Sequence, residues 1–256
     1  MSLTDILISF IGGFCAGSIN TLAGFGSIIT LAIYMDLLGL PGHIANATNR
    51  INVMASSSVS TATFYRYKML DLNKSGWHLS FIFIGAFIGI YLATIIDSAQ
   101  FKSAFSYVLI PILVILLMNP KKMIKPDPEA KPISKWVLGP MLFLSGIYAG
   151  FIQAGFGVIL LILLVMLAKE DLVKSNALKV AVVTIYTIVA LIIFQIQGML
   201  FWKMGLAMAV GQAFGGYFMA RNASKMKNAN VWAYRLLIVI VSLVIIKNFR
   251  LWEYFL

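Results

Sequence analysis

The chain of 256 residues is 61% hydrophobic, contains only 11% charged residues and has a formal net charge of +11. A soluble domain of this length would carry about 25% charged residues, so the composition excludes an ordinary soluble protein. Apolar runs of about twenty residues, separated by short polar segments, instead predict a polytopic helical membrane protein.

Ten apolar runs follow one another along the chain, five on each side of a polar segment. This Pro- and Lys-rich segment, 119–135, predicts a hydrated cytoplasmic linker between a first transmembrane repeat, 1–118, and a second, 136–256. All five tryptophans lie at or just beyond the ends of runs, as in the aromatic belt of a membrane protein. The runs cover residues 3–22, 25–38, 44–65, 76–96, 101–118, 136–153, 156–168, 173–194, 199–220 and 232–247.

The two halves of the sequence resemble each other residue by residue. The offset between matching residues shrinks from 133 to 131, 130 and 126 along the chain, as expected of a duplication followed by small deletions. Chance similarity between glycine-rich membrane helices is the alternative. The matches are Gly17 with Gly150, Asn20 with Gln153, Gly24 and Gly26 with Gly155 and Gly157, Asn46 with Asn176, and Gly85, Gly89 and Tyr91 with Gly211, Gly215 and Tyr217.

Each half opens with a long apolar stretch that Gly-Phe-Gly or its equivalent interrupts, at 24–26 and 155–157. As one helix, residues 3–38 would extend over roughly 54 Å, whereas the hydrocarbon core is about 30 Å thick. The break therefore predicts a re-entrant hairpin, two crossings, or one overlong broken crossing. With a reversal at both breaks, 15 Lys and Arg residues lie on one side of the membrane and 5 on the other, against 11 and 9 without reversal. Because Lys and Arg accumulate on the cytoplasmic side, reversal is favoured.

We therefore predict an all-α polytopic membrane protein of two homologous halves with inverted topology. Each half has a glycine-broken or re-entrant helix plus about three further transmembrane helices. The linker is expected to be cytoplasmic and both termini external, in the cytoplasmic (inner) membrane of a cell.

The residues that enzymes use are absent from the expected places. His43 and His78 have no carboxylate or second histidine at metal-ligand spacing, and neither HExxH nor GxSxG occurs. The single Cys15 offers no metal cluster. Because the basic residues lie between apolar runs, they indicate membrane topology rather than nucleic-acid binding. We expect no enzyme, no metal and no cofactor.

The charged residues closest to the membrane interior are positive. In the first half, Asn46, Asn49 and Arg50 share one helical arc, and in the second half Asn176 and Lys179 are three residues apart. Two cations facing a polar cavity would attract an anion, whereas the alternative is that both side chains snorkel to the membrane surface.

The glycine breaks fit an anion site as well. A helix that begins at each break would present free backbone N–H groups and the positive end of its dipole, and paired glycine-interrupted segments are typical of secondary transporters. Alternatively, the glycines only allow close helix packing, as we expect of Gly85-x-x-x-Gly89 and Gly211-x-x-x-Gly215. The candidate binding residues around the breaks are Asn20, Thr21, Gly24, Phe25, Gly26, Ser27, Gln153, Gly155 and Gly157.

The stretch "GGFCAGSINTLAGFGSIITL…LGLPGHIANATNRINV", with its weaker echo "SGIYAGFIQAGFGVIL…KSNALKV", resembles the TauE/SafE family of membrane transporters. The resemblance covers both halves and implies a permease of about eight helices that exports sulfite or a small organosulfur anion. On matching positions it implies roles for Asn20, Gly24, Gly26, Asn46, Asn49 and Arg50. The chain departs from the pattern at Phe25, where members often carry another glycine, and its second half lacks the proline and arginine of the first.

The predicted function is secondary transport of a small sulfur-containing anion by alternating access, with the anion near the membrane midplane between the two breaks. A passive anion channel and a non-transporting membrane scaffold are the alternatives. The expected partners are the anion and the lipid bilayer, and assembly into a homo-oligomer stays open.

Overall fold

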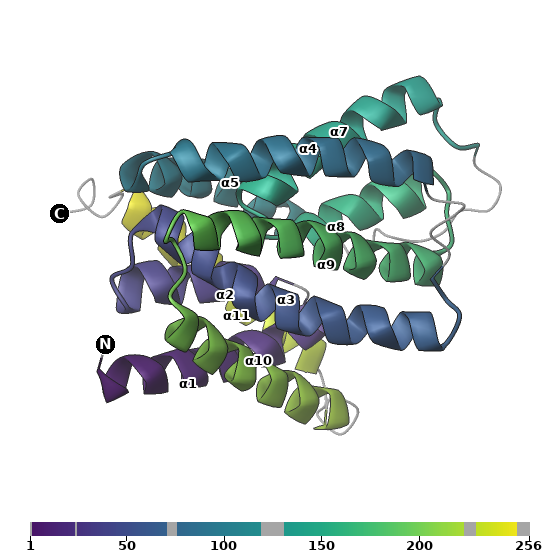
Figure 1. The fold of residues 1–256 in the computed structure, drawn as a ribbon. Coiled ribbons are helices and arrows are strands. Elements are labelled where there is room, and N and C mark those ends of the chain that lie inside the picture. The colour runs from purple at the N-terminus through teal and green to yellow at the C-terminus, as the bar shows by residue number, and fades with distance from the viewer. Residues whose placement is uncertain (1, 24, 71–75, 119–130, 223–228, 250–256) are drawn as a thin grey trace. The chain divides into compact units, whose positions relative to one another are not determined.

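A computed structural model describes residues 2–23, 25–70, 76–118, 131–222 and 229–249 (Figure 1). These residues form helices and turns, without a strand, which agrees with the predicted all-α class. In chain order the elements are α1 (Leu3–Ala23), α2 (Gly26–Ala32), the π-helix η1 (Ile33–Leu37), α3 (Gly42–Arg66), α4 (Gly76–Ile95), α5 (Ser98–Leu117), α7 (Lys135–Phe151), α8 (Phe156–Leu161), the π-helix η2 (Ile162–Leu167), α9 (Leu172–Ile196), α10 (Trp202–Asn222) and α11 (Ala229–Asn248).

Every predicted run corresponds to a helix whose bounds differ by a few residues. The two runs after the glycine breaks each consist of a short α-helix followed by a π-helix. Four helices in the described part of the chain are long and apolar enough to cross a membrane, so the chain is a multi-pass membrane protein. These spans are Leu3–Asn20, Gly76–Ile95, Ser98–Leu117 and Leu172–Ile196.

The chain folds into two compact units, and neither coincides with one half of the sequence. Unit 1 contains Met1–Asn52, Ile96–Asn119 and Gly198–Leu256, whereas unit 2 contains Val53–Ile95 and Pro120–Gln197. Thus α4, from the first half of the sequence, belongs to unit 2, and α10, from the second half, belongs to unit 1. The predicted linker lies outside the described residues over 119–130, and Ser134 caps α7 by accepting a hydrogen bond from the Trp136 N–H.

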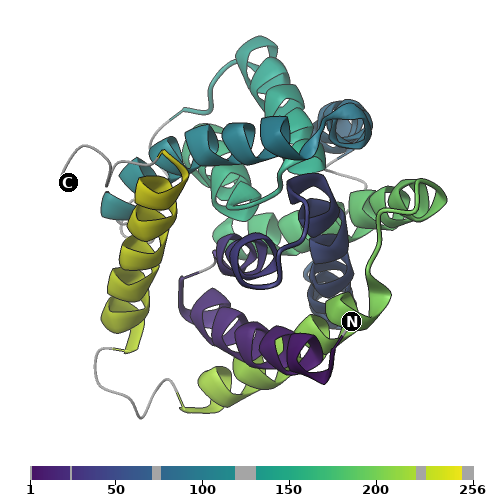
Figure 2. The ribbon, with the colours of Figure 1, turned by 90° about the vertical axis from the view of Figure 1, so that its left-hand side faces the viewer.

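Unit 1 is built around the close packing of α1 against α10, which lie side by side in Figures 1 and 2. Glycines on each helix face backbone carbonyl groups of the other, and a Cβ atom at any of them would collide with a carbonyl oxygen. Small residues at such an interface let two helix backbones approach closely in a membrane. The contacts are Gly13 with Met208, Gly17 with Gln212, Gly211 with Phe10, and Gly215 with Phe14.

Unit 2 repeats this packing between α4 and α7 (Figure 1). Its four contacts occur at residues shifted by 133 from the α1 positions and by 126 from the α10 positions of unit 1. The packing role predicted for the two Gly-x-x-x-Gly pairs is therefore confirmed. The contacts are Gly146 with Ile82, Gly150 with Ala86, Gly85 with Phe143, and Gly89 with Ile147.

The chain reverses direction at both glycine breaks. In unit 1, a Cβ atom on Gly12 of α1 would lie only 2.6 Å from the Ile33 Cδ1 atom of η1. In unit 2, the Ile133 N–H, just before α7, donates to the Leu167 carbonyl at the end of η2, with an N–O distance of 3.0 Å. Each returning arm has only about 18 Å of helix, which is less than the hydrocarbon thickness. These contacts exclude the single overlong crossing.

The second break turns through two residues with left-handed backbone. Gln153 has a φ angle of 69° and Gly155 has a φ angle of 75°. Glycine adopts this conformation without a Cβ penalty, so Gly155 is required by the turn itself. The first break contains Gly24, which lies outside the described residues, and then Phe25, the buried N-cap residue of α2.

Candidate functional site

A stretch of polar residues on α3 is buried in unit 1. Asn46, Asn49, Arg50 and Asn52 all lie within the first eleven residues of the helix and are at most 1% exposed. Arg50 is the largest fully buried side chain of the described residues. Ionisable residues inside a membrane protein are costly and mark functional sites by default. The arc predicted from the sequence is therefore inside the protein, and the snorkelling alternative is wrong for Arg50.

A hydrogen-bonded network joins α3 to α2 and α10. The Thr30 hydroxyl of α2 donates to the Asn49 Oδ1 atom over 2.6 Å. The Asn52 amide nitrogen donates to the same Asn49 oxygen over 3.1 Å and to the Gln212 Oε1 atom of α10 over 3.0 Å. All four side chains are buried, so the network fixes the rotamers of α3 residues next to Arg50.

Two atoms of this network have no hydrogen-bond partner among the described residues. They are the Asn49 Nδ2 donor and the Asn52 Oδ1 acceptor. The Tyr34 hydroxyl of η1, one helical turn beyond Thr30, is a third such group. A buried donor without a partner costs about 1–3 kcal/mol, and a ligand that accepts hydrogen bonds would remove this cost. An oxyanion offers only acceptors, and charge-assisted hydrogen bonds are the stronger ones.

The first glycine break lies beside this network, but a hydrogen bond within the break already occupies two of its polar groups. The Asn20 side-chain oxygen accepts a hydrogen bond from the Gly26 N–H over 2.9 Å, while Ser27 is half-buried. The expectation of free N–H groups at this helix start is therefore wrong for Gly26, because Asn20 reaches across the turn. Phe25 is only 2% exposed. Nothing is described for Gly24 or for the side chain of Thr21.

The second break, which lies in unit 2, also forms hydrogen bonds within its own turn. The Phe156 N–H donates to the Gln153 carbonyl and the Val158 N–H to the Gly155 carbonyl, both over 3.0 Å. The Gln153 amide nitrogen donates to the Tyr186 hydroxyl over 2.9 Å, which leaves its Oε1 atom without a partner among the described residues. The prediction of free N–H groups is wrong for Phe156 and Val158, because the tight turn supplies carbonyl acceptors for both. Gln153 is left with an acceptor rather than a donor.

The predicted cation of the second half does contact its break. The Lys179 side chain packs against Gly157, where a Cβ atom would lie 3.1 Å from the Lys179 Cδ atom. Its ammonium group donates to the Asn176 Oδ1 atom over 2.8 Å. Lys179 matches Asn49 in the sequence repeat. In both units, the segment after the break therefore contacts the same position of the next long helix. This position is Asn49 in unit 1 and Lys179 in unit 2.

Sequence reasoning missed several members of these clusters. Thr30, Asn52 and Gln212 were not singled out, although Asn52 lies three residues after Asn49 in the same polar stretch. Gln212 is the one polar side chain within Gly211-x-x-x-Gly215, which is a usable signal. Tyr186 carries no such signal, because an isolated tyrosine in an apolar helix is ordinary.

In unit 2, a histidine and a carboxylate lie close enough to form an ion pair when the imidazole is protonated. The His78 Nδ1 atom lies 3.4 Å from the Glu170 Oε1 atom, a contact that sequence spacing did not indicate. The described residues contain no group of three or more His, Cys, Asp or Glu side chains that could hold a metal ion.

The geometry defines a class of protein. Apolar spanning helices, two helical hairpins broken at glycines, and a buried cationic polar cluster beside one break are typical of membrane transporters. The comparison with protein families agrees. The chain belongs to the family described as "Sulfite exporter TauE/SafE", whose profile matches residues 9–248.

Curated relatives carry transporter names as well. A "Probable membrane transporter protein" of Haemophilus influenzae is 28% identical over 214 residues, which cover 82% of each chain. "Probable membrane transporter protein ORF9" of a Sinorhizobium species is 27% identical over 92% of this chain and 89% of its own. "Probable membrane transporter protein YfcA" of Escherichia coli K12 is 26% identical over 81% and 77%. No solved structure matches the chain.

Proposed function

We propose that this protein is a secondary transporter that moves a small sulfur-containing anion, sulfite or a short organosulfonate, across the cytoplasmic membrane. The observation that carries the proposal is the fully buried Arg50 beside the unpartnered Asn49 Nδ2 donor. A guanidinium and an amide donor offer charge and hydrogen bonds to an oxyanion in a dry environment, where both are stronger than in water. The family's description, which names sulfite, supports this class of substrate.

The residues have different proposed roles. Asn49 and Arg50 bind the anion, whereas Thr30, Asn52 and Gln212 position them through hydrogen bonds. Asn46 shares their helical arc. In unit 2, Lys179 supplies a second cation beside the break at Gly157, and Asn176 holds its ammonium group. Asn20 and Gln153 shape the two breaks rather than bind the anion.

We further propose alternating access between two inverted repeats, 1–118 and 136–256, with the linker 119–135 in the cytoplasm and both termini outside. The matching element order of the two halves supports a duplication. The reversal at both breaks gives the Lys and Arg distribution of 15 to 5 that this topology requires.

Arg50→Ala tests the site in proteoliposomes loaded with sulfite. We expect sulfite flux to fall at least about tenfold, which is about 1.4 kcal/mol of lost stabilisation, while the variant still inserts and elutes as a monodisperse species. Arg50→Lys keeps the charge without the planar fork and should retain part of the flux. Lys203→Ala, an exposed cation at the start of α10, is the matched control.

Unchanged sulfite flux in folded Arg50→Ala would remove Arg50 from the site. The kinetics of the unmodified protein separate the rival functions. Saturable flux with trans-stimulation supports a transporter, whereas flux that rises linearly with concentration indicates a channel. A complete lack of flux for sulfite, sulfoacetate, taurine and thiosulfate would favour a scaffold.

A further inference from the structure

A polar cavity of about 590 Å³ lies in unit 1, among residues that the transport proposal does not use. It is formed where the beginning of α5 meets the end of α11. Its lining combines two lysines, two serines and an asparagine with small or aromatic side chains. The lining residues are Ala99, Lys102, Ser103, Ser106, Tyr107, Lys247, Asn248 and Phe249.

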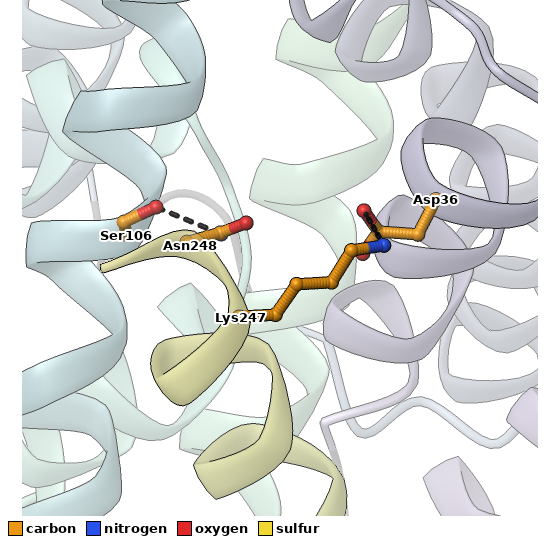
Figure 3. A network of polar contacts seen from close by, with 4 residues as sticks. All are labelled: Asp36, Ser106, Lys247 and Asn248. Atoms are coloured by element: carbon orange, nitrogen blue, oxygen red, sulfur yellow. Dashed lines mark hydrogen bonds and ion pairs between the residues drawn. The ribbon is translucent and has the colours of Figure 1, made fainter. Parts of the chain in front are cut away.

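Among the described residues, one of the two lysines at this cavity forms an ion pair and the other does not. Lys247 donates to the Asp36 carboxylate of η1 over 2.7 Å (Figure 3). The described residues provide no ion-pair partner for Lys102, which is exposed on the first turns of α5. The three side chains together therefore carry one net positive charge. A ligand group with a single negative charge, such as a phosphodiester, would balance it.

The polar atoms of the cavity can bind a ligand that carries a hydrogen-bond donor as well as a negative charge. The Asn248 amide nitrogen donates to the Ser106 hydroxyl over 2.8 Å, and Figure 3 shows the amide oxygen on the side away from Ser106. This buried oxygen has no partner among the described residues. A hydroxyl group on the ligand would satisfy it, while the Ser103 hydroxyl and the Lys102 ammonium group can donate to phosphate oxygens.

Apolar surface continues from the cavity along both helices. On α5, the exposed residues Tyr107, Ile110, Val114 and Leu117 recur every three or four residues and so share one face. On α11, an equivalent exposed face leads to Lys247 and consists of Leu236, Val239 and Leu243. The Tyr107 and Phe249 rings meet edge to face at the cavity, with their centroids 5.2 Å apart. A soluble anion would make no use of these faces, whereas acyl chains would.

We propose that this cavity, formed by α5 and α11, binds the head group of an anionic phospholipid. The phosphodiester lies between Lys102 and Lys247, a head-group hydroxyl donates to the Asn248 oxygen, and the acyl chains follow the apolar faces of the two helices. Basic pockets between transmembrane helices can recognise acidic lipid head groups through their charge. The ligand class is a glycerophospholipid with one negative charge and a hydroxyl-bearing head group.

Native mass spectrometry of the delipidated full-length protein tests the assignment, with phosphatidylglycerol as the probe. Phosphatidylcholine with the same acyl chains is the lipid control, because its head group has no net charge and no hydroxyl donor. We expect at least a fivefold preference for phosphatidylglycerol, and Lys102→Gln should remove this preference. Lys203→Gln, which replaces an exposed lysine at the start of α10, should leave it unchanged.

Three results would overturn the proposal. Equal adducts with both lipids would show that the head group is not recognised, and an undiminished preference in Lys102→Gln would place the lipid elsewhere. Binding of inorganic phosphate that depends on Lys102 and equals lipid binding would make the cavity a site for a soluble anion. Lys102 is exposed, so the variant is expected to fold, and its thermal unfolding in detergent verifies this.

Discussion

The two units share the same glycine-mediated helix packing but differ in the side chains that lie beside it. Glycines of α1 and α10 in unit 1, and of α7 and α4 in unit 2, face carbonyl groups at equivalent positions. In unit 1, Asn52 and Gln212 form a buried hydrogen bond over 3.0 Å. The residues that match them in unit 2, Val182 and Ala86, are buried and apolar.

This difference shows that the backbone packing of the helices and the polarity of the neighbouring side chains vary independently in this protein. Contacts between backbones tolerate only glycine at the crossing, so they have stayed the same in both units. The side chains beside these glycines are free to change: Gln212 belongs to a polar network in unit 1, whereas its counterpart in unit 2 is Ala86. We therefore expect unit 1 to determine which anion is bound.

The largest expected effect comes from the glycine contacts that both units share. Gly17→Val and the equivalent Gly150→Val each force side-chain atoms into a facing backbone, at Gln212 and Ala86 respectively. Overpacking of this kind costs about 3 kcal/mol or more when backbone must move. We expect both variants to lose most monodisperse protein in size-exclusion chromatography. Gly76→Ala, where a Cβ meets nothing within 4 Å, is the control, and a stable Gly150→Val would break the equivalence of the units.

The next effect concerns the polar network alone. Asn52→Val with Gln212→Ala gives unit 1 the residues of unit 2, and we expect sulfite flux to fall about tenfold, or 1.4 kcal/mol, since Asn49 loses its orientation. Each single substitution leaves a buried polar group unpaired and should destabilise by about 1–3 kcal/mol, whereas the double variant should recover part of this. Thermal unfolding of all four proteins measures the coupling. Strictly additive losses would contradict a direct Asn52–Gln212 interaction.

A smaller effect is expected in unit 2. Tyr186→Phe removes the hydroxyl that accepts from the Gln153 amide, and this should lower stability by about 1 kcal/mol with less than a twofold change in flux. Transport assays and thermal unfolding are run on the same preparation. A transport loss as large as that of the unit 1 double variant would mean that the second break binds substrate directly.

The smallest effect is expected at the surface ion pair between Asp36 and Lys247. The lysine is 49% exposed, so Asp36→Asn should cost only about 0.5 kcal/mol, and less at high salt. Unfolding temperatures at low and high salt measure this. A loss above about 2 kcal/mol would show that the pair is more than a surface contact.

The sequence was sufficient for features that depend on local pattern. Helix positions, the two breaks and the packing glycines follow from apolar run lengths and glycine spacing, and the structure agrees with them. Arg50 and Asn49 also stood out, because polar residues are rare in such runs. The exchange of α4 and α10 between units could not be predicted, since no local signal says which distant glycine face meets which.

The free N–H groups were predicted wrongly at Gly26, Phe156 and Val158 for a related reason. Helix propensity and glycine spacing place a break, but they do not show that the Asn20 side chain reaches the Gly26 N–H across it. Likewise, Thr30 and Asn49 are nineteen residues apart, and only the reversal of the chain brings them together. Contacts of this kind depend on tertiary geometry.

The exchange of α4 and α10 also determines when each glycine contact can form during synthesis of the chain. At 5–20 residues per second, α7 emerges about 3–12 s after α4, so unit 2 can close its glycine contact early. The α1 helix must instead wait about 10–40 s for α10, with its glycine face uncovered in the bilayer. Since Gln212 arrives on that same late helix, the polar network around Asn49 is completed only when the chain is nearly finished. A partly synthesised chain therefore lacks the complete polar network that we propose for the anion.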